Sequence, residues 1–493
     1  MDKDLVTSPA KRAYSLDMLR GIAILLMILS GLEPFGSLPS WMYHAQTPPP
    51  SHQFDPNLPG ITWVDLVFPF FIFSMGAAIP LSLGRRLKSG QSVFSLSIAT
   101  LRRFAWLLGF AIFAKNINPF SISGEPTAGI WLVCMLMFGL MFAIWGRWPW
   151  NMPAGARTGI KTAGIIAACS ILYFITYKDG KGFSVYRSNI ILHVLANLVL
   201  FGGLIWLFTR NHPMLRLGVM ALVLAIGLSA SAENSWLKTA GSHYELTFIK
   251  PYLTEKLRFL YDLSWIIQWR FLKYLFIIIP ATIIGENISD WLSSKTEKED
   301  TAWAPFRYIM LLVLSLCIVF VTVAGLKARY VFVTFAAASV LSLLVYLTVR
   351  KPLNSDERLI EVMSRWAPFW LVLGFLLEPY QGGIKKDPST LSYYFICTAL
   401  AIYCIIIFTV LLQRYNLTKY FKVLIYNGQN PMIAYISTPN VLHPLLGLFG
   451  LRAALLDFYS SHPLPGFVLA VVLTAAVAVF VSVFSKKKIY LRT

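Results

Sequence analysis

A histidine and an aspartate stand near the start of an apolar segment, in a pattern that suits proton transfer. His44 lies in the stretch "WMYHAQTPPPSHQFDPNLP", and Asp65 follows it in "GITWVDLVFPFF". Histidine takes up and releases protons near neutral pH, and a neighbouring carboxylate raises its basicity and orients its ring. The pair predicts a general base at His44 that is oriented by Asp65.

His52, in the same stretch, is a rival for that role. Six prolines stiffen residues 41–71, which contain no Lys or Arg, and this stiffening suits a histidine held in one place. Simpler interpretations stay open for each residue. A loop histidine is often exposed and without function, and Asp65 can serve as the carboxylate at a helix N-terminus, with Thr62 as the cap.

A polar stripe runs along one face of the segment "RSNIILHVLANLVL". Asn189, His193 and Asn197 follow one another at intervals of four residues, so they stack on one side of a helix. In an apolar span such a stripe faces the bundle interior, where it either lines a polar pathway or holds helices together. The residues alone leave both alternatives open.

Two further polar groups lie toward the ends of the chain. Asp17 and Arg20, in "SLDMLRGIAIL", are either a local ion pair or a contact for an anionic cofactor. In "NGQNPMIAY", Gly428 and Pro431 interrupt a helix close to Gln429 and Asn430. Interrupted helices line cavities in membrane proteins, although Asn430 can equally cap an ordinary helix start.

These candidate residues must be positioned by apolar segments, which occur along the whole chain. The 493 residues are 57% hydrophobic and 13% charged, whereas soluble domains carry about 25% charged residues. Apolar runs long enough to cross a bilayer recur from end to end. We predict an all-α polytopic integral membrane protein, a single domain over residues 1–493 with about fourteen spans (range 11–14) and no soluble domain. The predicted spans are residues 16–33, 61–83, 98–115, 127–146, 158–177, 188–208, 213–231, 265–285, 305–324, 329–349, 364–379, 390–413, 428–448 and 465–485, of which 364–379 is short and a candidate re-entrant segment.

The distribution of positive charge predicts the orientation. Cations precede the first span at Lys3, Lys11 and Arg12, are absent from residues 33–61, and reappear in the next loop and at the C-terminus. Because cytoplasmic loops are rich in Lys and Arg, both termini are expected in the cytoplasm and the His44 loop in the periplasm of a bacterial inner membrane. This topology also explains the net charge of +20 without nucleic-acid binding.

Several reaction classes find no support in the sequence. Walker A, G-x-S-x-G, H-E-x-x-H and glycine-rich dinucleotide motifs are absent. The five cysteines lie in apolar runs without a C-x-x-C pair, so neither a metal site nor a disulfide framework is expected.

Three motifs carry a resemblance to a known family. "SLDMLRGIAILLMIL", the His44–Ala45 pair and "GITWVDLVFPFFIFSMGAAIPLSL" together resemble the membrane core of the heparan-alpha-glucosaminide N-acetyltransferase family, in particular a bacterial branch of it. The resemblance is best over residues 1–120 and 388–493, and the middle of the chain diverges and has extra helices. The insertion "QTPPPSHQFDPNLP" between Ala45 and Gly60 lengthens the path from His44 to Asp65.

The resemblance implies a function. Members of that family move an acetyl group from cytosolic acetyl-CoA to a glucosamine-type acceptor across the membrane, and the family's catalytic histidine and aspartate carry over to His44 and Asp65. His44 is then a general base or a transient acetyl carrier. We expect acetyl-CoA as co-substrate, no metal, a sugar or glycan acceptor and a surrounding lipid bilayer, with a homodimer as one possible assembly. The expected cofactor contacts are Asp17, Arg20, Asn189, His193, Asn197, Gln429 and Asn430.

A secondary transporter of a sugar or lipid-linked glycan precursor is the alternative. Many spans, interrupted helices and buried polar groups are also typical of such carriers.

Overall fold

The structure, a computed structural model, describes residues 12–32, 38–233, 235–237, 244–246, 250–254, 257–294 and 301–492. The cations Lys3 and Lys11, which entered the topology prediction, lie outside these ranges.

The described chain is built almost entirely from helices, because its apolar runs are punctuated by proline, glycine and short polar turns. The helices are α1 (Tyr14–Ser30), α2 (Trp63–Ile79), α3 (Arg85–Lys88), α4 (Val93–Asn116), α5 (Pro119–Ile122), α6 (Ala128–Trp145), α7 (Ala154–Phe174), α8 (Ile190–Thr209), α9 (Pro213–Ser231), α11 (Arg258–Tyr261), α12 (Leu275–Ser294), α13 (Pro305–Lys327), α14 (Val331–Thr348), α15 (Ser355–Leu376), α16 (Leu391–Thr409), α17 (Lys422–Gln429), α18 (Pro431–Ser437), α19 (His443–Leu448), α20 (Leu451–Ser461) and α21 (Pro463–Lys486). Two short strands, β1 (Gly146–Arg147) and β2 (Tyr490–Leu491), pair antiparallel.

Eleven helices within the described residues are long and apolar enough to cross a membrane, and a twelfth span results if one bent pair is counted. The predicted all-α polytopic membrane class is therefore confirmed. The eleven are Trp63–Lys88, Val93–Asn116, Ala128–Trp145, Ile190–Thr209, Pro213–Ser231, Leu263–Ser294, Pro305–Lys327, Val331–Thr348, Ser355–Leu376, Leu391–Arg414 and Pro463–Lys486.

The predicted number of about fourteen spans is too high, although eleven to twelve lies within the predicted range. Helix α1 has 17 residues, and α7 carries Arg157 and Lys161 in its first turns, so neither is among the eleven. The segment predicted at 428–448 is interrupted at Asn430, and the helix beyond it bends by 104° where Gly450 takes a positive φ of 69°. Proline and glycine, which break regular backbone hydrogen bonding, explain these interruptions.

The prediction that the segment at 364–379 is short is wrong. Helix α15 begins earlier, at Ser355, and has 22 residues, enough to span. Its first turn contains Asp356 and Glu357. Asn354 caps this turn by accepting a hydrogen bond from the Glu357 N–H, so the acidic residues belong to the helix N-terminus, where they offset the helix dipole.

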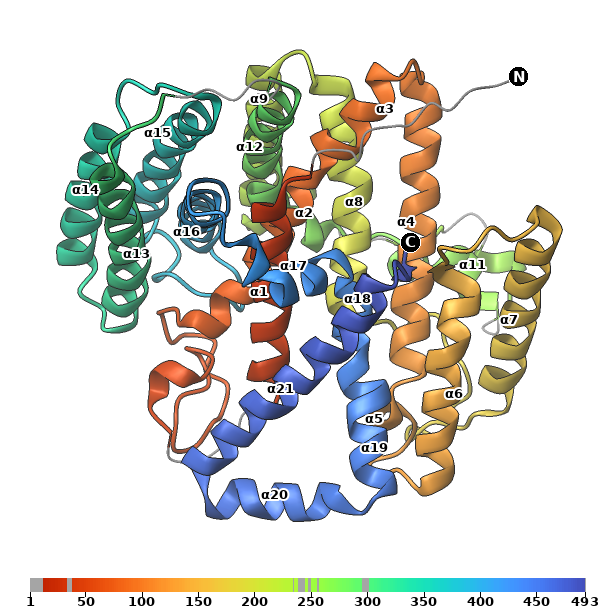
Figure 1. The fold of residues 1–493 in the computed structure, drawn as a ribbon. Helices are drawn as coiled ribbons and strands as arrows, with labels where there is room; N and C mark the ends of the chain where they lie inside the picture. Colours follow the sequence, from red (N-terminus) through yellow and green to blue (C-terminus); the bar gives the residue numbers. More distant parts are fainter. Residues whose placement is uncertain are drawn as a thin grey trace.

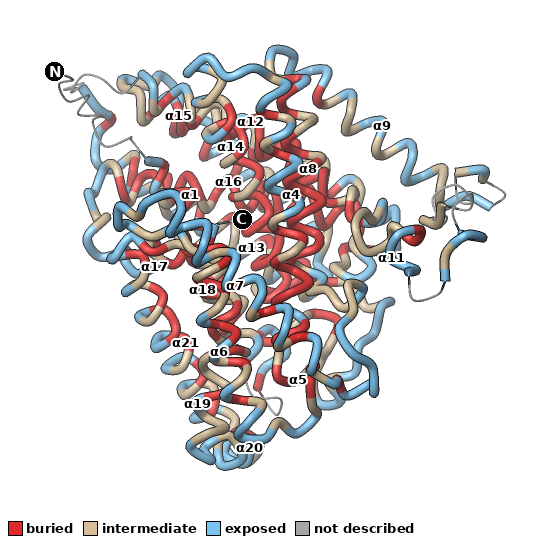
Figure 2. The backbone as a smooth tube through the Cα atoms, turned by 90° about the vertical axis from the view of Figure 1, so that its right-hand side faces the viewer, coloured by how far each residue is buried: buried red, intermediate tan, exposed pale blue. Residues whose placement is uncertain are grey.

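Helix α16 lies at the centre of one half of the bundle, and Figure 1 shows α13 and α14 outside it at one edge and α6 and α7 at the opposite edge. Of the 18-residue apolar stretch in the α16 span, 89% is buried, whereas only 6% of the corresponding stretch in α9 is buried. Figure 2 shows the same contrast between the buried central helices and the exposed α9. The central helices α1, α2 and α16 contact one another and carry Asp17, Arg20, Asp65 and Tyr393, which are discussed below.

Helices α1 and α17 approach so closely that only glycine fits between them. A β-carbon at Gly428 would lie 1.7 Å from the Asp17 carbonyl oxygen, and one at Gly21 would lie 1.9 Å from that of Leu424. The glycines of "LRG" and "NGQN" therefore serve close helix contact. The helix break predicted at Gly428 and Pro431 lies at Asn430, between α17 and α18.

Candidate active site

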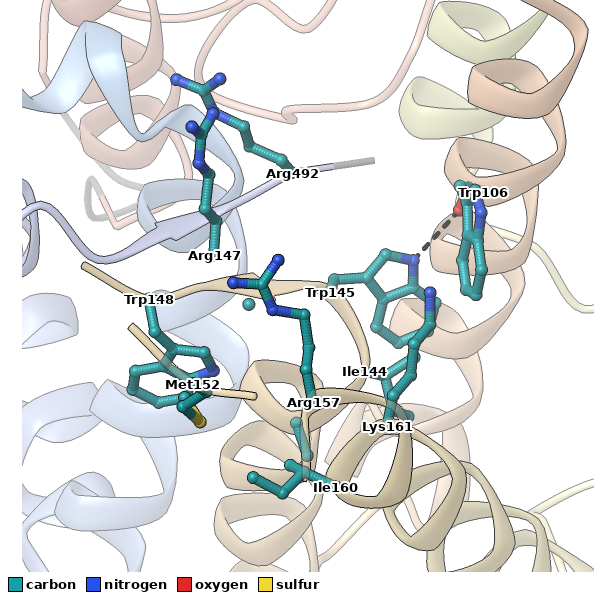
Figure 3. A pocket seen from close by; sticks show the side chains of 12 residues that line it. Trp106, Ile144, Trp145, Arg147, Trp148, Met152, Arg157, Ile160, Lys161 and Arg492 are labelled. Atoms are coloured by element: carbon teal, nitrogen blue, oxygen red, sulfur yellow. Dashed lines mark hydrogen bonds between the residues drawn. The ribbon is translucent and has the colours of Figure 1, made fainter. Parts of the chain in front are cut away.

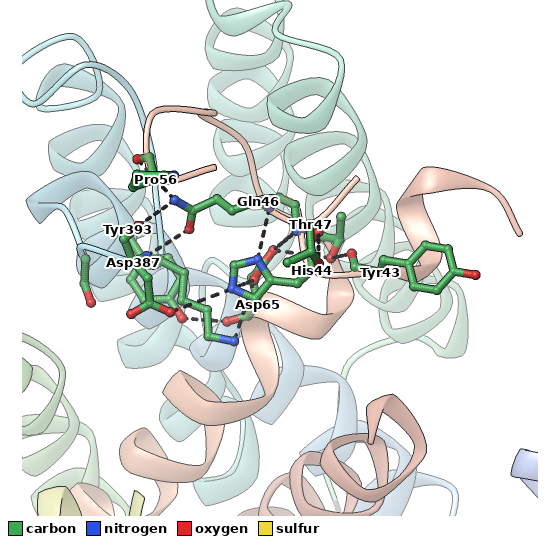
Figure 4. Close-up of polar contacts among 12 residues, drawn as sticks. Tyr43, His44, Gln46, Thr47, Pro56, Asp65, Asp387 and Tyr393 are labelled. Carbon is green, nitrogen blue, oxygen red and sulfur yellow. Dashed lines mark hydrogen bonds and ion pairs between the residues drawn. The ribbon is translucent and has the colours of Figure 1, made fainter. Parts of the chain in front are cut away.

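The structure brings His44 and Asp65 together (Figure 4). His44 Nε2 lies 3.3 Å from Asp65 Oδ1, and their side chains are 18% and 0% exposed. The backbone of the loop is anchored on both sides of the histidine, because Tyr43 and Ala45 are buried. The insertion after Ala45 therefore loops away without separating the pair.

Asp65 has one oxygen occupied by structural contacts and one directed toward the histidine. Its Oδ2 accepts hydrogen bonds from the N–H groups of Ala45 at 3.1 Å and Thr62 at 2.9 Å, and from the Thr62 hydroxyl at 3.3 Å. Thr62 is the N-cap of α2, so Asp65 completes a capping box. Its Oδ1 accepts no hydrogen bond from the described residues and faces His44. The capping and site interpretations of Asp65 are compatible, since each uses a different oxygen.

The His44 ring has a defined tautomer in its neutral form. Its Nδ1 accepts a hydrogen bond from the Gln46 N–H at 3.0 Å, and a backbone N–H can only donate. The ring proton therefore resides on Nε2. Two carboxylates lie near this proton, because Asp387 Oδ2 is 3.8 Å from Nε2, and 55% of the Asp387 side chain is exposed.

Asp387 and its neighbours are absent from the residues predicted above. Asp387 follows Lys386 in the loop between α15 and α16, and Lys386 Nζ is 3.8 Å from Asp65 Oδ1. The facing His44 ring, followed by the positive charge of Lys386, lowers the pKa of Asp387 below its ordinary value. The charged run "KKD" just before the span at 390–413 was the available signal, since it lies at the same predicted membrane surface as His44.

Gln46 and Tyr393 are also missed by sequence reasoning. Gln46 is fully buried, and its amide bonds to the backbone of the Asp387 loop. The Tyr393 hydroxyl donates to the Asp65 carbonyl oxygen at 2.7 Å. Both contacts join segments more than three hundred residues apart in the sequence, so the local sequence does not indicate them.

His52 lies elsewhere. Its ring packs edge-on against the Tyr43 ring, with centroids 4.6 Å apart, and its backbone has a positive φ of 48°. The structure thus brings His44 rather than its rival to Asp65.

Asp17 and Arg20 lie deeper in the bundle. Asp17 pairs with Arg12 at 2.7 Å and lies 3.7 Å from Arg20. The Arg20 guanidinium donates to the hydroxyl and carbonyl oxygens of Ser74 in α2 and to the Gly428 carbonyl oxygen. Arg20 therefore joins three helices near the middle of the span Trp63–Lys88.

The predicted stripe on α8 is bonded to neighbouring protein groups. Asn189 caps α8 and exchanges hydrogen bonds with the Tyr435 hydroxyl at 2.9 and 3.1 Å. His193 Nε2 lies 3.1 Å from the Ile266 carbonyl oxygen, and Asn197 donates to the His193 carbonyl oxygen. These contacts favour the interpretation that the stripe holds helices together.

Gln429 and Asn430 differ in what they contact. The Gln429 amide reaches Asp17 at 3.5 Å. Asn430 precedes Pro431 at the predicted helix start, but its side chain does not cap α18. The Asn430 amide instead donates to the Ile489 carbonyl oxygen at 2.8 Å and accepts from the Leu491 N–H at 3.3 Å, and so holds β2 in place.

Among the described residues no group of three or more His, Cys, Asp and Glu side chains is arranged to hold a metal ion.

Comparison with known proteins finds two similarities, each over part of the chain. A family model with the description "Domain of unknown function (DUF5009)" matches residues 12–288, more than half of the sequence. The chain is also 36% identical to human heparan-alpha-glucosaminide N-acetyltransferase over 96 residues, or 19% of this chain. That segment spans 12% of the human protein, so the two proteins are distant relatives over a short region.

Proposed function

This chain belongs to the family described as domain of unknown function DUF5009, and we propose that it is a membrane acetyltransferase. The donor is acetyl-CoA, and the acceptor is the amine or hydroxyl of a glucosamine-type sugar or another glycan. The human relative is an N-acetyltransferase, which supports the reaction class. The observation that carries the proposal is the 3.3 Å contact between His44 Nε2 and the buried Asp65 carboxylate.

In the proposed reaction, the acceptor nitrogen or oxygen attacks the carbonyl carbon of the thioester. A C–N or C–O bond forms, the C–S bond breaks, and the CoA sulfur leaves as a thiolate that takes up a proton. The proton lost by the acceptor passes to His44 Nε2. The resulting imidazolium faces the carboxylates of Asp65 and Asp387, which stabilise its charge.

One rearrangement must precede proton transfer. Because the Gln46 N–H now occupies Nδ1, the neutral ring holds its proton on Nε2, where the acceptor's proton must go. The 44–47 turn has to release Nδ1 so that the ring can carry its proton there and present a free lone pair on Nε2. We assign this step to acceptor binding. The same free Nε2 is required if His44 instead carries the acetyl group transiently.

The length of α2 supports a reaction that uses both membrane surfaces. Asp65 and Lys88 lie near opposite ends of the continuous helical span Trp63–Lys88, about 35 Å apart along its axis, and a hydrocarbon core is about 30 Å thick. Arg85, Arg86 and Lys88 mark the cytoplasmic end by the positive-inside rule, so His44 faces the periplasm in this proposal.

A donor path along α1 and α2 fits the proposal. Arg20 contacts Ser74, which lies nine residues, or about 14 Å of helix, from Asp65. A cavity of about 10 Å³, room for about one water molecule, lies beside this stretch with Ile24, Met27 and Phe71 in its wall, so the helices must separate for a donor to pass. The pantetheine arm, roughly equal to four extended residues, spans about 14 Å. Arg20 would thus contact the polar end of the arm while the thioester reaches His44.

The half-exposed Asp387 gives the acceptor a counter-ion. A glucosamine amine is a cation before it reacts, and the Asp387 carboxylate is ionised and accessible beside His44. Binding of the ammonium group to Asp387 brings it within reach of Nε2, which takes one proton and so frees the nitrogen lone pair for attack. The second proton, released as the C–N bond forms, goes to the leaving CoA thiolate.

The experiment is acetyl transfer by purified protein in detergent, with labelled acetyl-CoA and glucosamine. His44→Ala is compared with His52→Ala, a matched change in the same loop. We expect loss of CoA release and sugar labelling in His44→Ala alone. Loss in His52→Ala alone would place the chemistry in the insertion. Absence of both turnover and acetyl-CoA binding in wild type would contradict an enzyme and favour the transporter, to be measured as sugar flux in liposomes.

A further inference from the structure

A basic cavity of about 360 Å³ lies away from His44, between α4, α6, α7 and the C-terminal end of the chain. Its volume falls within the ordinary range for small-molecule sites, about 300–1,000 Å³. Figure 3 shows Arg147 and Arg492 side by side at one wall, with Arg157 extending between them and Trp145. The cavity adjoins the C-terminal end of α6 and the N-terminal end of α7, the same side of the bundle as the loop between α3 and α4.

The wall that carries Arg147 and Arg492 is built from distant segments. Gly146 and Arg147 in β1 pair with Leu491 and Tyr490 in β2, and the Arg492 N–H donates to the Trp145 carbonyl oxygen at 3.0 Å. Asn430 holds β2 through the two hydrogen bonds described above. Two guanidinium groups are therefore placed next to each other by ordered backbone.

Within the described part of the chain, no carboxylate lines this cavity to balance its positive charges. Arg147, Arg157, Lys161 and Arg492 line it, and no lining residue is acidic. Burial, followed by the neighbouring guanidinium of Arg147, lowers the pKa of Arg492. Like charges held together repel, and an anion between them relieves both the repulsion and the cost of desolvation.

The basic region continues toward the centre of the bundle. Arg103, one turn before the lining residue Trp106 in α4, lies within electrostatic range of Arg492 and of Arg20. A series of cations thus extends from the cavity to Arg20, where the proposed donor path begins. A single carboxylate, that of Asp17, pairs with this series within the described part of the chain.

Aromatic rings complete the cavity. Trp148 stacks on Trp150 with centroids 5.1 Å apart, while Trp106 and Trp145 meet edge to face. Lys161 Nζ lies 3.5 Å from the centroid of the Trp106 ring. Tryptophan faces beside guanidinium groups are the combination that binds a base and its phosphates, through stacking and charge-assisted hydrogen bonds.

We propose that this cavity binds the phosphorylated adenosine end of CoA, with Arg147 and Arg492 on the phosphates. The inference rests on the proposed function for the identity of the nucleotide and assigns it a site outside the His44 region. The shared ligand chemistry is phosphate, for which the headgroup of an anionic phospholipid is the other source.

The test is CoA binding to the purified full chain by calorimetry. Arg147→Gln, Arg492→Gln and the double variant are compared with wild type, and Lys88→Gln, an exposed cation on the same side, is the matched control. Since each charge-assisted hydrogen bond is worth one to two factors of ten, we expect about tenfold weaker binding in each single variant and unchanged binding in the control. Arg492→Lys should recover part of the affinity.

Two further ligands distinguish the ends of CoA. Adenosine 3′,5′-bisphosphate should compete with CoA in wild type and lose affinity in the Arg variants, whereas pantetheine binding should be the same in all. Equal CoA affinity in all variants, or no CoA binding to wild type, would overturn the inference.

Reconstitution with and without phosphatidylglycerol in phosphatidylcholine nanodiscs identifies a lipid site. If the Arg variants lose thermal stabilisation by phosphatidylglycerol but bind CoA as wild type does, the cavity binds lipid and the inference is wrong.

S-acetylpantetheine, which lacks the nucleotide, separates this inference from the proposed function. Turnover of S-acetylpantetheine that is equal in wild type and Arg variants, with acetyl-CoA turnover reduced in the variants, supports both. If CoA affinity falls in the variants but no donor supports acetyl transfer, the nucleotide site stands and the proposed function fails. Acetyl-CoA turnover that is unchanged in the variants leaves the function intact and rejects the site.

Discussion

The Gln46 side chain exchanges two hydrogen bonds with the backbone of Asp387. The amide nitrogen donates to the Asp387 carbonyl oxygen at 2.6 Å, and the Asp387 N–H donates to the amide oxygen at 2.9 Å. The backbone N–H of the same Gln46 contacts His44 Nδ1. One buried residue therefore sets the distance between the histidine and its second, more exposed carboxylate.

Gln46→Ala should release the Asp387 loop while it keeps the backbone N–H that contacts His44. We expect the acceptor KM to rise by about tenfold, because Asp387 loses its position, with a smaller change in kcat. Gln53→Ala, an exposed glutamine in the same loop, is the control. Steady-state kinetics with varied acceptor measures the effect. An equal fall in kcat and no change in KM would contradict this role.

Asp65→Asn separates the two roles of the aspartate. The amide can still accept hydrogen bonds at the start of α2 but carries no charge for His44, so we expect a loss of about 1 kcal/mol of stability or less and a fall of a hundredfold or more in kcat. Asp65→Ala removes the contacts with Ala45 and Thr62 as well and should cost a further 1–3 kcal/mol. Thermal unfolding in detergent and turnover are measured in parallel. A large loss of stability in both variants would reduce Asp65 to a structural residue.

Asp387→Asn should change the acid dependence of stability. The folded-state pKa of Asp387 is lowered by the facing His44 ring, so the ionised form stabilises the fold above the unfolded-state pKa, about 3.9. This contribution is present at neutral pH and is lost as the pH falls through the folded-state value. Its size stays within about 1 kcal/mol, since the side chain is half exposed.

The measurement is the melting temperature of wild type and Asp387→Asn between pH 3.5 and 7. We expect a constant difference above about pH 5 that shrinks toward acid. A difference that grows as the pH falls would contradict the direction of this pKa shift.

Gly428→Ala should destabilise the bundle, because the new methyl group would collide with the Asp17 carbonyl oxygen on α1. Overpacking of this kind costs about 1–3 kcal/mol or more when the obstacle is backbone. Gly109→Ala, in α4, is the matched control, because nothing lies within 4 Å of its β-carbon position and alanine favours a helix. Thermal unfolding of both variants gives the comparison. Equal stability of the two would show that α1 and α17 can separate at no cost.

The all-α membrane class and the position of most spans could be predicted from the sequence, because crossing a bilayer requires a long, continuous apolar run that is visible locally. The capping of α2 by Thr62 and Asp65 is local as well, since both residues lie within one turn. The exact number of spans could not be predicted, since proline and glycine bend the chain near 449–450 only as the surrounding helices allow.

Only the tertiary structure decided which residues gather around Asp65. His44 and His52 are both close to it in sequence, but the anchoring of Tyr43 and Ala45 selects His44. Asp387 joins them across more than three hundred residues. Asn430, which the sequence suggested for a cavity wall, holds the C-terminal strand instead. The physical reason is that a helix start or an apolar span depends on neighbours in the chain, whereas contacts between distant loops depend on how the helices pack.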